Sequence, residues 1–311
     1  MEQAQIVFLQ LLSLFGMVLI GYCAIKWGLL PEAAKEVLPD YVTKLAMPAA
    51  ILKNLLSVDR ALLSASGVIV GAAAVGLLIS WLLGRGSARL FHLPSDTANA
   101  HTLSNMYSNT TFLGIPLLTA LYPQGVFCIP IYSLTCNVAL YTVSTGLYTK
   151  DAAQRGGGAK EVLRRLANPV TLATLFGIAL VLLGWSLPSL VVDIVGRVGE
   201  TSSTISMLYI GTVLTGMDLS AVWKRLSILA TIPVRMVALP LVVFCILRAL
   251  GTTELVTSVL TVMFALPCQV SISMLAKTGG SDYIYVTEYV LIYTLLSIVT
   301  IPLVTTLMAM L

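Results

Sequence analysis

This chain contains few charged residues. Charged residues make up 10% of its 311 residues and hydrophobic residues 58%, whereas soluble domains carry about 25% charged residues. The formal net charge is only +4, and basic residues do not gather into blocks with interleaved aromatics, which argues against a nucleic-acid partner. The composition therefore excludes an ordinary soluble domain and predicts a protein embedded in a lipid bilayer.

The chain also lacks the usual signatures of enzymes and metal sites. Neither H-E-x-x-H, G-x-S-x-G nor a Walker-type phosphate loop occurs. The five cysteines form no C-x-x-C pair and lie in apolar stretches, so we expect buried free thiols: Cys23, Cys128, Cys136, Cys245 and Cys268. We expect no enzymatic activity, no catalytic residue, no cofactor and no metal site beyond a bound sodium ion.

Apolar stretches long enough to cross a bilayer recur along the chain. A stretch of about twenty residues spans the hydrocarbon core, and the sequence gives about ten: 6–26, 37–57, 62–84, 97–122, 125–148, 169–190, 198–217, 227–249, 255–276 and 284–309. The first has neither a basic flank nor a clear cleavage site, so we interpret it as a membrane helix rather than a signal peptide. The expected fold class is an all-α integral membrane protein.

One longer connector divides these spans into two sets of five. We expect a first repeat over 1–148, a cytoplasmic connector over 149–168 and a second repeat over 169–311. Lysine and arginine concentrate on the odd-numbered connectors, which places both termini outside the cytoplasm of a multi-pass protein of the plasma (inner) membrane. An odd number of spans in each half gives the halves opposite orientations, which predicts an inverted repeat.

The fourth span of each half is interrupted at its centre by proline and small polar residues. The first interruption reads Ser-Asn-Thr-Thr-Phe-Leu-Gly-Ile-Pro over 108–116, and the second reads Phe-Ala-Leu-Pro-Cys-Gln-Val-Ser over 264–271. Backbone freed from a helix cannot face lipid, so it must line a polar cavity or be buried in protein. Broken helices at matching positions of two halves are typical of secondary transporters.

Polar residues of the first interruption are candidates for binding an anion. Asn109 and Thr110 precede Gly114 and Pro116, and the half-helix that begins there presents free N–H groups and a positive dipole end. We therefore expect a small organic carboxylate as substrate. The alternative is that these residues cap one another and only stabilise a kink.

The second interruption and two nearby spans offer oxygen ligands. Gln269 and Ser271 follow Pro267, and Asn137 and Asn105 lie on the fifth and fourth spans. Such side chains beside unwound backbone could coordinate sodium, although polar contacts that only pack helices explain the pattern equally well.

Ionisable groups within the spans are costly in lipid and are functional candidates. We expect Glu200 and Arg235 to serve either in ion coupling or in an internal charge pair, and Lys53 and Glu288 to reach the interface. A proton relay through His101 is a further alternative.

These segments resemble the auxin efflux carrier family, which includes the plant PIN-FORMED proteins and bacterial permeases. Asn-Thr-Thr-Phe-Leu-Gly-Ile-Pro over 109–116 resembles the broken fourth helix of that family, and further likenesses follow in order: Leu-Ala-Met-Pro at 45–48, Val-Arg at 234–235 with a proline at 240, and Ala-Leu-Pro at 265–267.

The resemblance implies the fold of bile-acid sodium symporters, in which the broken fourth and ninth helices cross in a transport domain beside a scaffold domain. It implies an elevator-type movement and a homodimer. It also implies that Asn109, Pro116 and Pro267 contact a substrate carboxylate, and that Glu200 matches an acidic position of the seventh helix. The long regulatory loop of plant members is replaced here by the short connector 149–168.

The sequence thus predicts an elevator-type secondary transporter of small organic anions, such as auxin-like indole carboxylates or dicarboxylates, coupled to sodium or protons. An uncoupled uniporter or an anion channel is the alternative, because the same polar breaks could line a continuous pore.

Overall fold

The chain folds almost entirely into helices. The computed structural model describes residues 2–56, 65–148, 167–216, 225–270, 272–273, 276 and 281–311. Ser271 and most of the predicted connector, residues 149–166, lie outside the described residues. Within these ranges no strand forms, and the one extended pairing is an isolated backbone bridge. The predicted all-α class is confirmed.

The helices are listed here in chain order: α1 (Glu2–Lys26), α2 (Ala34–Tyr41), η1 (Val42–Ala46), α3 (Met47–Leu56), α4 (Ser66–Leu90), α5 (Ser95–Met106), η3 (Thr110–Gly114), α6 (Ile115–Leu121), η4 (Pro123–Gly125), α7 (Cys128–Tyr148), α10 (Pro169–Leu183), α11 (Ser189–Leu214), α12 (Leu226–Leu229), η6 (Pro233–Ala238), α13 (Leu239–Ala249), α14 (Glu254–Ala265) and α16 (Tyr283–Met310).

Three of these elements, η1, η3 and η6, are single turns of π-helix, and each ends two residues before a proline. The prolines are Pro48, Pro116 and Pro240. A proline lacks the N–H that would bond to the carbonyl four residues earlier, and a π-helical turn absorbs this defect without ending the helix. The sequence thereby builds a widened turn into three of its helices.

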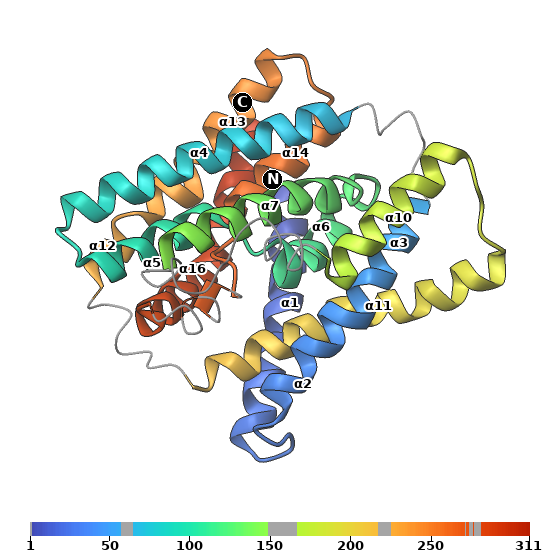
Figure 1. The fold of residues 1–311 in the computed structure, drawn as a ribbon, viewed down its shortest axis with the longest axis horizontal. Helices are drawn as coiled ribbons and strands as arrows, with labels where there is room; N and C mark the ends of the chain where they lie inside the picture. The colour runs from blue at the N-terminus through green and yellow to red at the C-terminus, as the bar shows by residue number, and fades with distance from the viewer. Residues whose placement is uncertain are drawn as a thin grey trace.

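One group of helices, which we call the flanking bundle, consists of α1, α2, η1, α3, α10 and α11. These helices pack chiefly against one another and lie together beneath and beside the rest of the molecule in Figure 1. The backbones of α1 and α11 touch at two glycines: a Cβ at Gly21 would lie 2.1 Å from the carbonyl oxygen of Leu208, and one at Gly211 would lie 2.0 Å from that of Val18. Small residues that allow such close approach are typical of helix contacts in membranes.

The other helices form the crossing bundle, which consists of α4, α5, η3, α6, η4, α7, α12, η6, α13, α14 and α16. The two bundles meet where α11 contacts η3 and α6 and where α1 contacts α16. At the first of these contacts the rings of Phe112 and Tyr209 lie 4.9 Å apart between centroids. Each bundle draws helices from both of the predicted halves.

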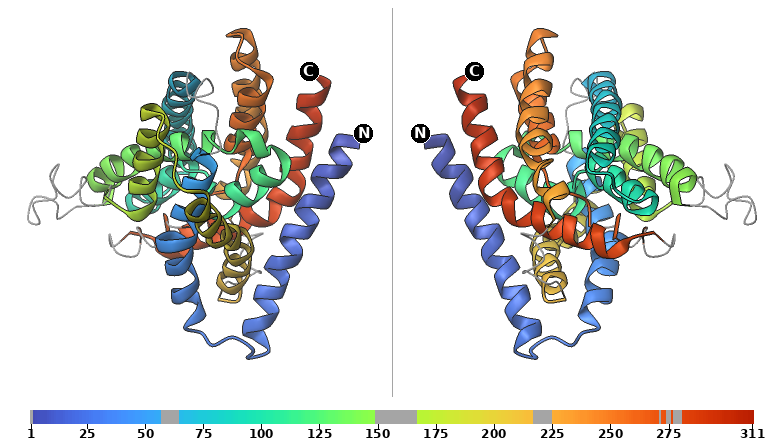
Figure 2. Two further views of the ribbon diagram at one scale, coloured as in Figure 1. Left: turned by 90° about the vertical axis from the view of Figure 1, so that its right-hand side faces the viewer. Right: turned by 90° about the vertical axis from the view of Figure 1, so that its left-hand side faces the viewer.

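Much of the outer surface is apolar. Large side chains such as Leu19, Leu82, Phe176 and Val299 are more than half exposed, as expected where lipid covers the surface. Among the described residues, three helices are long and apolar enough to cross a membrane: Ser66–Leu90, Leu226–Ala249 and Tyr283–Met310. The two chain ends lie at the same end of the molecule in Figure 2.

Candidate functional site

The two interrupted helices meet at their breaks. The N–H of Asn109 donates to the carbonyl oxygen of Pro267 at 2.7 Å, and the N–H of Gln269 donates to that of Tyr107 at 3.0 Å. The two short extended segments run antiparallel to each other. Backbone groups that left their own helices are therefore paired with each other, as the interior of a membrane protein demands.

The first break lies at the start of the predicted interruption. The backbone leaves α5 at Tyr107 (φ −110°, ψ 120°), and the helix that follows runs from η3 into α6, with Pro116 as the second residue of α6. The proline that we expected to interrupt the span therefore lies within the helix after the break, where the widened turn η3 accommodates its missing N–H. The second break does include Pro267, two residues after the end of α14.

The side-chain amide of Asn109 has its oxygen hydrogen-bonded and its nitrogen without a partner. Its Oδ1 accepts from the N–H of Phe112 at 3.1 Å and so caps the helix that follows the break. Its Nδ2 is buried and has no hydrogen-bond partner. Because a buried donor without a partner costs about 1–3 kcal/mol, the crossing holds a fixed donor that a bound acceptor would satisfy.

Other predicted substrate residues surround Asn109. The hydroxyl of Thr110 lies 3.1 Å from that of Ser133 on α7. The N–H of Gly114 donates to the carbonyl oxygen of Asn109, and a Cβ at Gly114 would lie 2.8 Å from a methyl carbon of Leu266. A side chain at position 114 would therefore require the Leu266 side chain to shift.

The residues predicted to couple an ion are not all in one place. Asn105 is buried near the end of α5, donates through Nδ2 to the carbonyl of His101 at 3.0 Å and leaves its buried Oδ1 unpartnered. Gln269 at the second break and Asn137 on α7 are half-buried, and Asn137 lies one helical turn beyond Ser133.

Glu200 lies on α11 in the flanking bundle, away from this cluster. Its carboxylate is exposed and forms an ion pair of 2.7 Å with Lys53 on α3. The structure therefore brings Glu200 together with Lys53 and not with the residues that meet at the crossing. Among the described residues no three histidine, cysteine or acidic side chains gather in a group that could hold a metal ion.

Arg235 is the charged residue at the centre of the crossing. It lies in η6 and is 2% exposed. Its Nε donates to the carbonyl oxygen of Asn105 at 2.6 Å, one Nη donates to the carbonyl oxygen of Phe264, and the other Nη donates to the hydroxyl of Ser108 at 2.7 Å. The expected charge pair is not observed: among the described residues no carboxylate forms an ion pair with Arg235.

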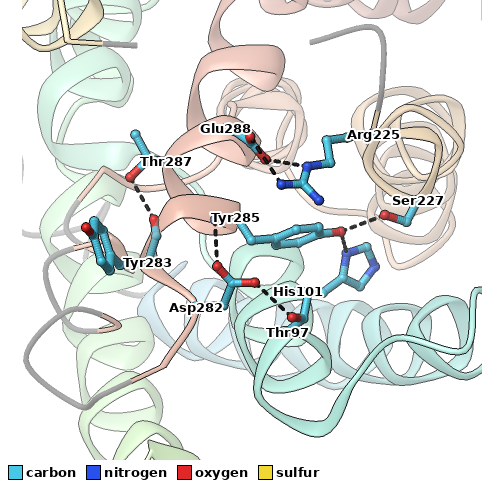
Figure 3. Close-up of polar contacts among 9 residues, drawn as sticks. All are labelled: Thr97, His101, Arg225, Ser227, Asp282, Tyr283, Tyr285, Thr287 and Glu288. Atoms are coloured by element: carbon cyan, nitrogen blue, oxygen red, sulfur yellow. Dashed lines mark hydrogen bonds and ion pairs between the residues drawn. The ribbon is translucent and has the colours of Figure 1, made fainter. Parts of the chain in front are cut away.

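A second polar cluster connects α5, α12 and α16 (Figure 3). The hydroxyl of Tyr285 lies 2.8 Å from Nδ1 of His101 and 2.9 Å from the hydroxyl of Ser227. Beside it, Nε of Arg225 donates to the carboxylate of Glu288 at 2.5 Å. By accepting this hydrogen bond, the Glu288 carboxylate raises the pKa of the Arg225 guanidinium, which is the charged end of this cluster.

Sequence reasoning missed the tyrosines of this cluster. Tyr285, Tyr289 and Tyr293 are spaced by four residues and therefore share one face of α16, and all three are buried. The hydroxyls of Tyr289 and Tyr293 lie 2.7 Å apart, and Thr231 lies 2.9 Å from the second. A tyrosine repeat at helical spacing was the signal that could have found them.

Comparison with known proteins agrees with the geometry. The chain is 24% identical over 301 residues to the uncharacterized transporter MJ1031 of Methanocaldococcus jannaschii, which covers 92% of this chain and 94% of that protein. It is 24% identical over 231 residues to the lysosomal cholesterol signaling protein of Mus musculus, which covers 67% of this chain. That match spans only 26% of the mouse protein.

The family described as Membrane transport protein matches residues 6–305, nearly the whole chain. The resemblance drawn from the broken helices is thereby confirmed, and with it the coarse interpretation as a membrane transport protein rather than an enzyme family. The chain belongs to the auxin efflux carrier-like Membrane transport protein family.

Proposed function

We propose that this protein is a secondary transporter of small organic anions that binds the substrate carboxylate at the crossing of its two broken helices. The observation that carries the proposal is Asn109. Its Nδ2 is buried without a partner, and its orientation is fixed because Oδ1 caps the following helix. A carboxylate oxygen would accept from Nδ2 and would also face the positive end of the helix that starts at this residue.

The substrate class follows from the chemistry of the donor. An amide donor and a helix N-terminus recognise a carboxylate without restricting what is attached to it, so indole carboxylates and dicarboxylates are both candidates. We also propose that transport is coupled to a sodium or proton gradient, with an uncoupled uniporter as the alternative. We also propose that the protein acts in the plasma (inner) membrane.

Elevator-type movement is supported by the division into two bundles. The crossing and its polar residues belong to the crossing bundle, and the flanking bundle is held by its own glycine contacts. An apolar hollow of about 360 Å³ on the flanking bundle is lined by Pro48, Leu52, Leu172, Phe176 and Val195. We propose that this side carries the contact of a homodimer.

Asn109→Asp tests the carboxylate site. Aspartate caps a helix as well as asparagine does, so the cap is preserved, but Nδ2 is replaced by a second acceptor that repels an anion. A hydrogen bond to a charged group contributes about 1.5–3 kcal/mol, so we expect binding of the anion to weaken at least about tenfold. Binding is measured by the shift in melting temperature of purified protein across a panel of indole carboxylates and dicarboxylates.

The chain offers a matched control. Asn168 caps α10 in the flanking bundle, where its Oδ1 accepts from the N–H of Thr171 at 3.0 Å. Asn168→Asp makes the same chemical change at a cap outside the crossing and should leave binding unchanged. Equal anion affinity in the two variants would remove Asn109 from the site, and ionic currents that do not saturate with substrate would favour the channel alternative.

A further inference from the structure

Arg235 occupies the point at which two broken helices end. Asn105 lies in the last turn of α5 and Phe264 in the last turn of α14, and the backbone carbonyl of each accepts a hydrogen bond from the guanidinium. Carbonyls in the last turn of a helix have no intrahelical partner. One side chain therefore satisfies orphan acceptors from both half-helices at once.

The charges at this point balance without an acidic residue. The C-terminal end of a helix carries about half a negative elementary charge, so the ends of α5 and α14 together offer about one. Arg235 supplies one positive charge and is 2% exposed. This accounts for a buried arginine that has no carboxylate partner among the described residues, an arrangement that would otherwise be costly.

The guanidinium is fixed in place by its three hydrogen bonds. Its planar fork presents five N–H donors in fixed directions. The backbone N–H of Arg235 donates to the carbonyl of Thr231 at 2.8 Å, which ties η6 to the residues before it. A cationic side chain is therefore held at the crossing.

Exchangeable cations take this position in other broken-helix transporters, where half-helix C-termini and unwound carbonyls coordinate sodium. We propose that Arg235 is a built-in cation that replaces sodium at the crossing, so that the organic anion binds without sodium. This inference rests on the proposed function for the nature of the anion. Arg235 acts as a positioning residue, because it holds the ends of α5 and α14 and the hydroxyl of Ser108 in one arrangement.

The first measurement is the melting temperature of the purified wild-type protein, without substrate, in sodium, potassium or choline chloride at equal ionic strength. We expect the same value in all three salts. Binding of a carboxylate that stabilises the protein should likewise be equal in sodium and choline. A stabilisation specific to sodium, or anion binding that requires it, would overturn the proposal.

Arg235→Ala removes the guanidinium and leaves its position between the two helix ends open to another cation. We expect the melting temperature to fall by more than roughly 5 °C, because removal of one partner from a buried charged arrangement is strongly destabilising. Sodium or millimolar guanidinium should restore part of the loss, since either can now occupy the carbonyls of Asn105 and Phe264. A loss that neither cation reverses would contradict the proposed replacement.

Arg248→Ala is the matched control. Arg248 lies on α13, the next helix along, is exposed and rests over the ring of Phe244, so its loss should cost little and respond to neither cation. If Arg235→Ala does not fold, Ser108→Ala removes one of the three hydrogen bonds and leaves both carbonyl contacts in place. It should lower the melting temperature by less, without sodium dependence, and a sodium-specific gain in this variant would count against the proposal.

These outcomes separate the inference from the proposed function. The melting temperatures in the three salts and the rescue of Arg235→Ala are measured without any organic anion. They therefore test the built-in cation even if the proposed substrate class is wrong. If no carboxylate binds in any salt, the proposed function fails. If carboxylates bind only with sodium, the proposed function stands and the built-in cation fails.

Discussion

Replacement of Gly21 by alanine should separate the two longest helices of the flanking bundle. A Cβ atom at this position would lie 2.1 Å from the carbonyl oxygen of Leu208, whereas real Cβ contacts essentially never fall below 3.0 Å. The helices α1 and α11 must therefore move apart by about 0.9 Å at this point. A gap of 0.5–1 Å already forfeits about a quarter to a half of the dispersion energy of each contact.

The magnitude follows from two opposing effects. Overpacking of a well-packed contact costs typically about 1–3 kcal/mol, and alanine regains about 1 kcal/mol over glycine in a helix. We expect the free energy of unfolding of Gly21→Ala to fall by about 0–2 kcal/mol on balance. The assay is thermal unfolding in one detergent, followed by intrinsic fluorescence.

Gly16 supplies the control on the same helix, because a Cβ there would meet nothing within 4 Å. Gly16→Ala should be neutral or stabilised. The reasoning is refuted if Gly21→Ala melts at or above the temperature of Gly16→Ala, since the close backbone contact would then not exist.

Two further predictions concern the polar cluster of Figure 3. Tyr285→Phe should lower the free energy of unfolding by about 1–3 kcal/mol, because His101 and Ser227 each lose a buried partner. Tyr283→Phe, at an exposed position on the same helix, should change the free energy of unfolding little. Equal melting temperatures of the two variants would speak against a buried network. Glu288→Gln should destabilise the protein more than Glu32→Gln, because the Glu288 side chain is only 16% exposed beside Arg225 whereas that of Glu32 is 74% exposed beside Lys35. Chemical denaturation of both variants measures the difference, and Arg225→Gln completes a double-mutant cycle with Glu288→Gln. A coupling energy near zero between Arg225 and Glu288 would contradict this prediction.

The sequence predicted the broken segments because breaks have a local signal. Asparagine, threonine, glycine and proline inside an apolar span disfavour a continuous helix, and both breaks overlap the predicted windows. Pro116 itself does not mark the first break, because the π-helical turn η3 accommodates it within the helix that follows. A proline alone does not say whether the helix stops there or continues through a widened turn.

The partners of Arg235 carried no such signal. Two of its three acceptors are backbone carbonyls, of Asn105 and Phe264, and every residue has a carbonyl. The sequence could therefore mark a buried arginine as costly, but it could not distinguish a charge pair from a site formed by two helix ends. Glu200 illustrates the converse, because an acidic residue within an apolar span turned out to be exposed and paired with Lys53.

The bridge between the breaks has a consequence for biogenesis. The N–H of Asn109 bonds to the carbonyl of Pro267, a residue that the ribosome adds only after more than half of the second half has been synthesised. Until then the first broken helix must enter the membrane with backbone groups that its own half cannot pair. The first half of the chain is thus synthesised with an open polar gap, and it is the arrival of the second half that allows the lipid-embedded protein to close it.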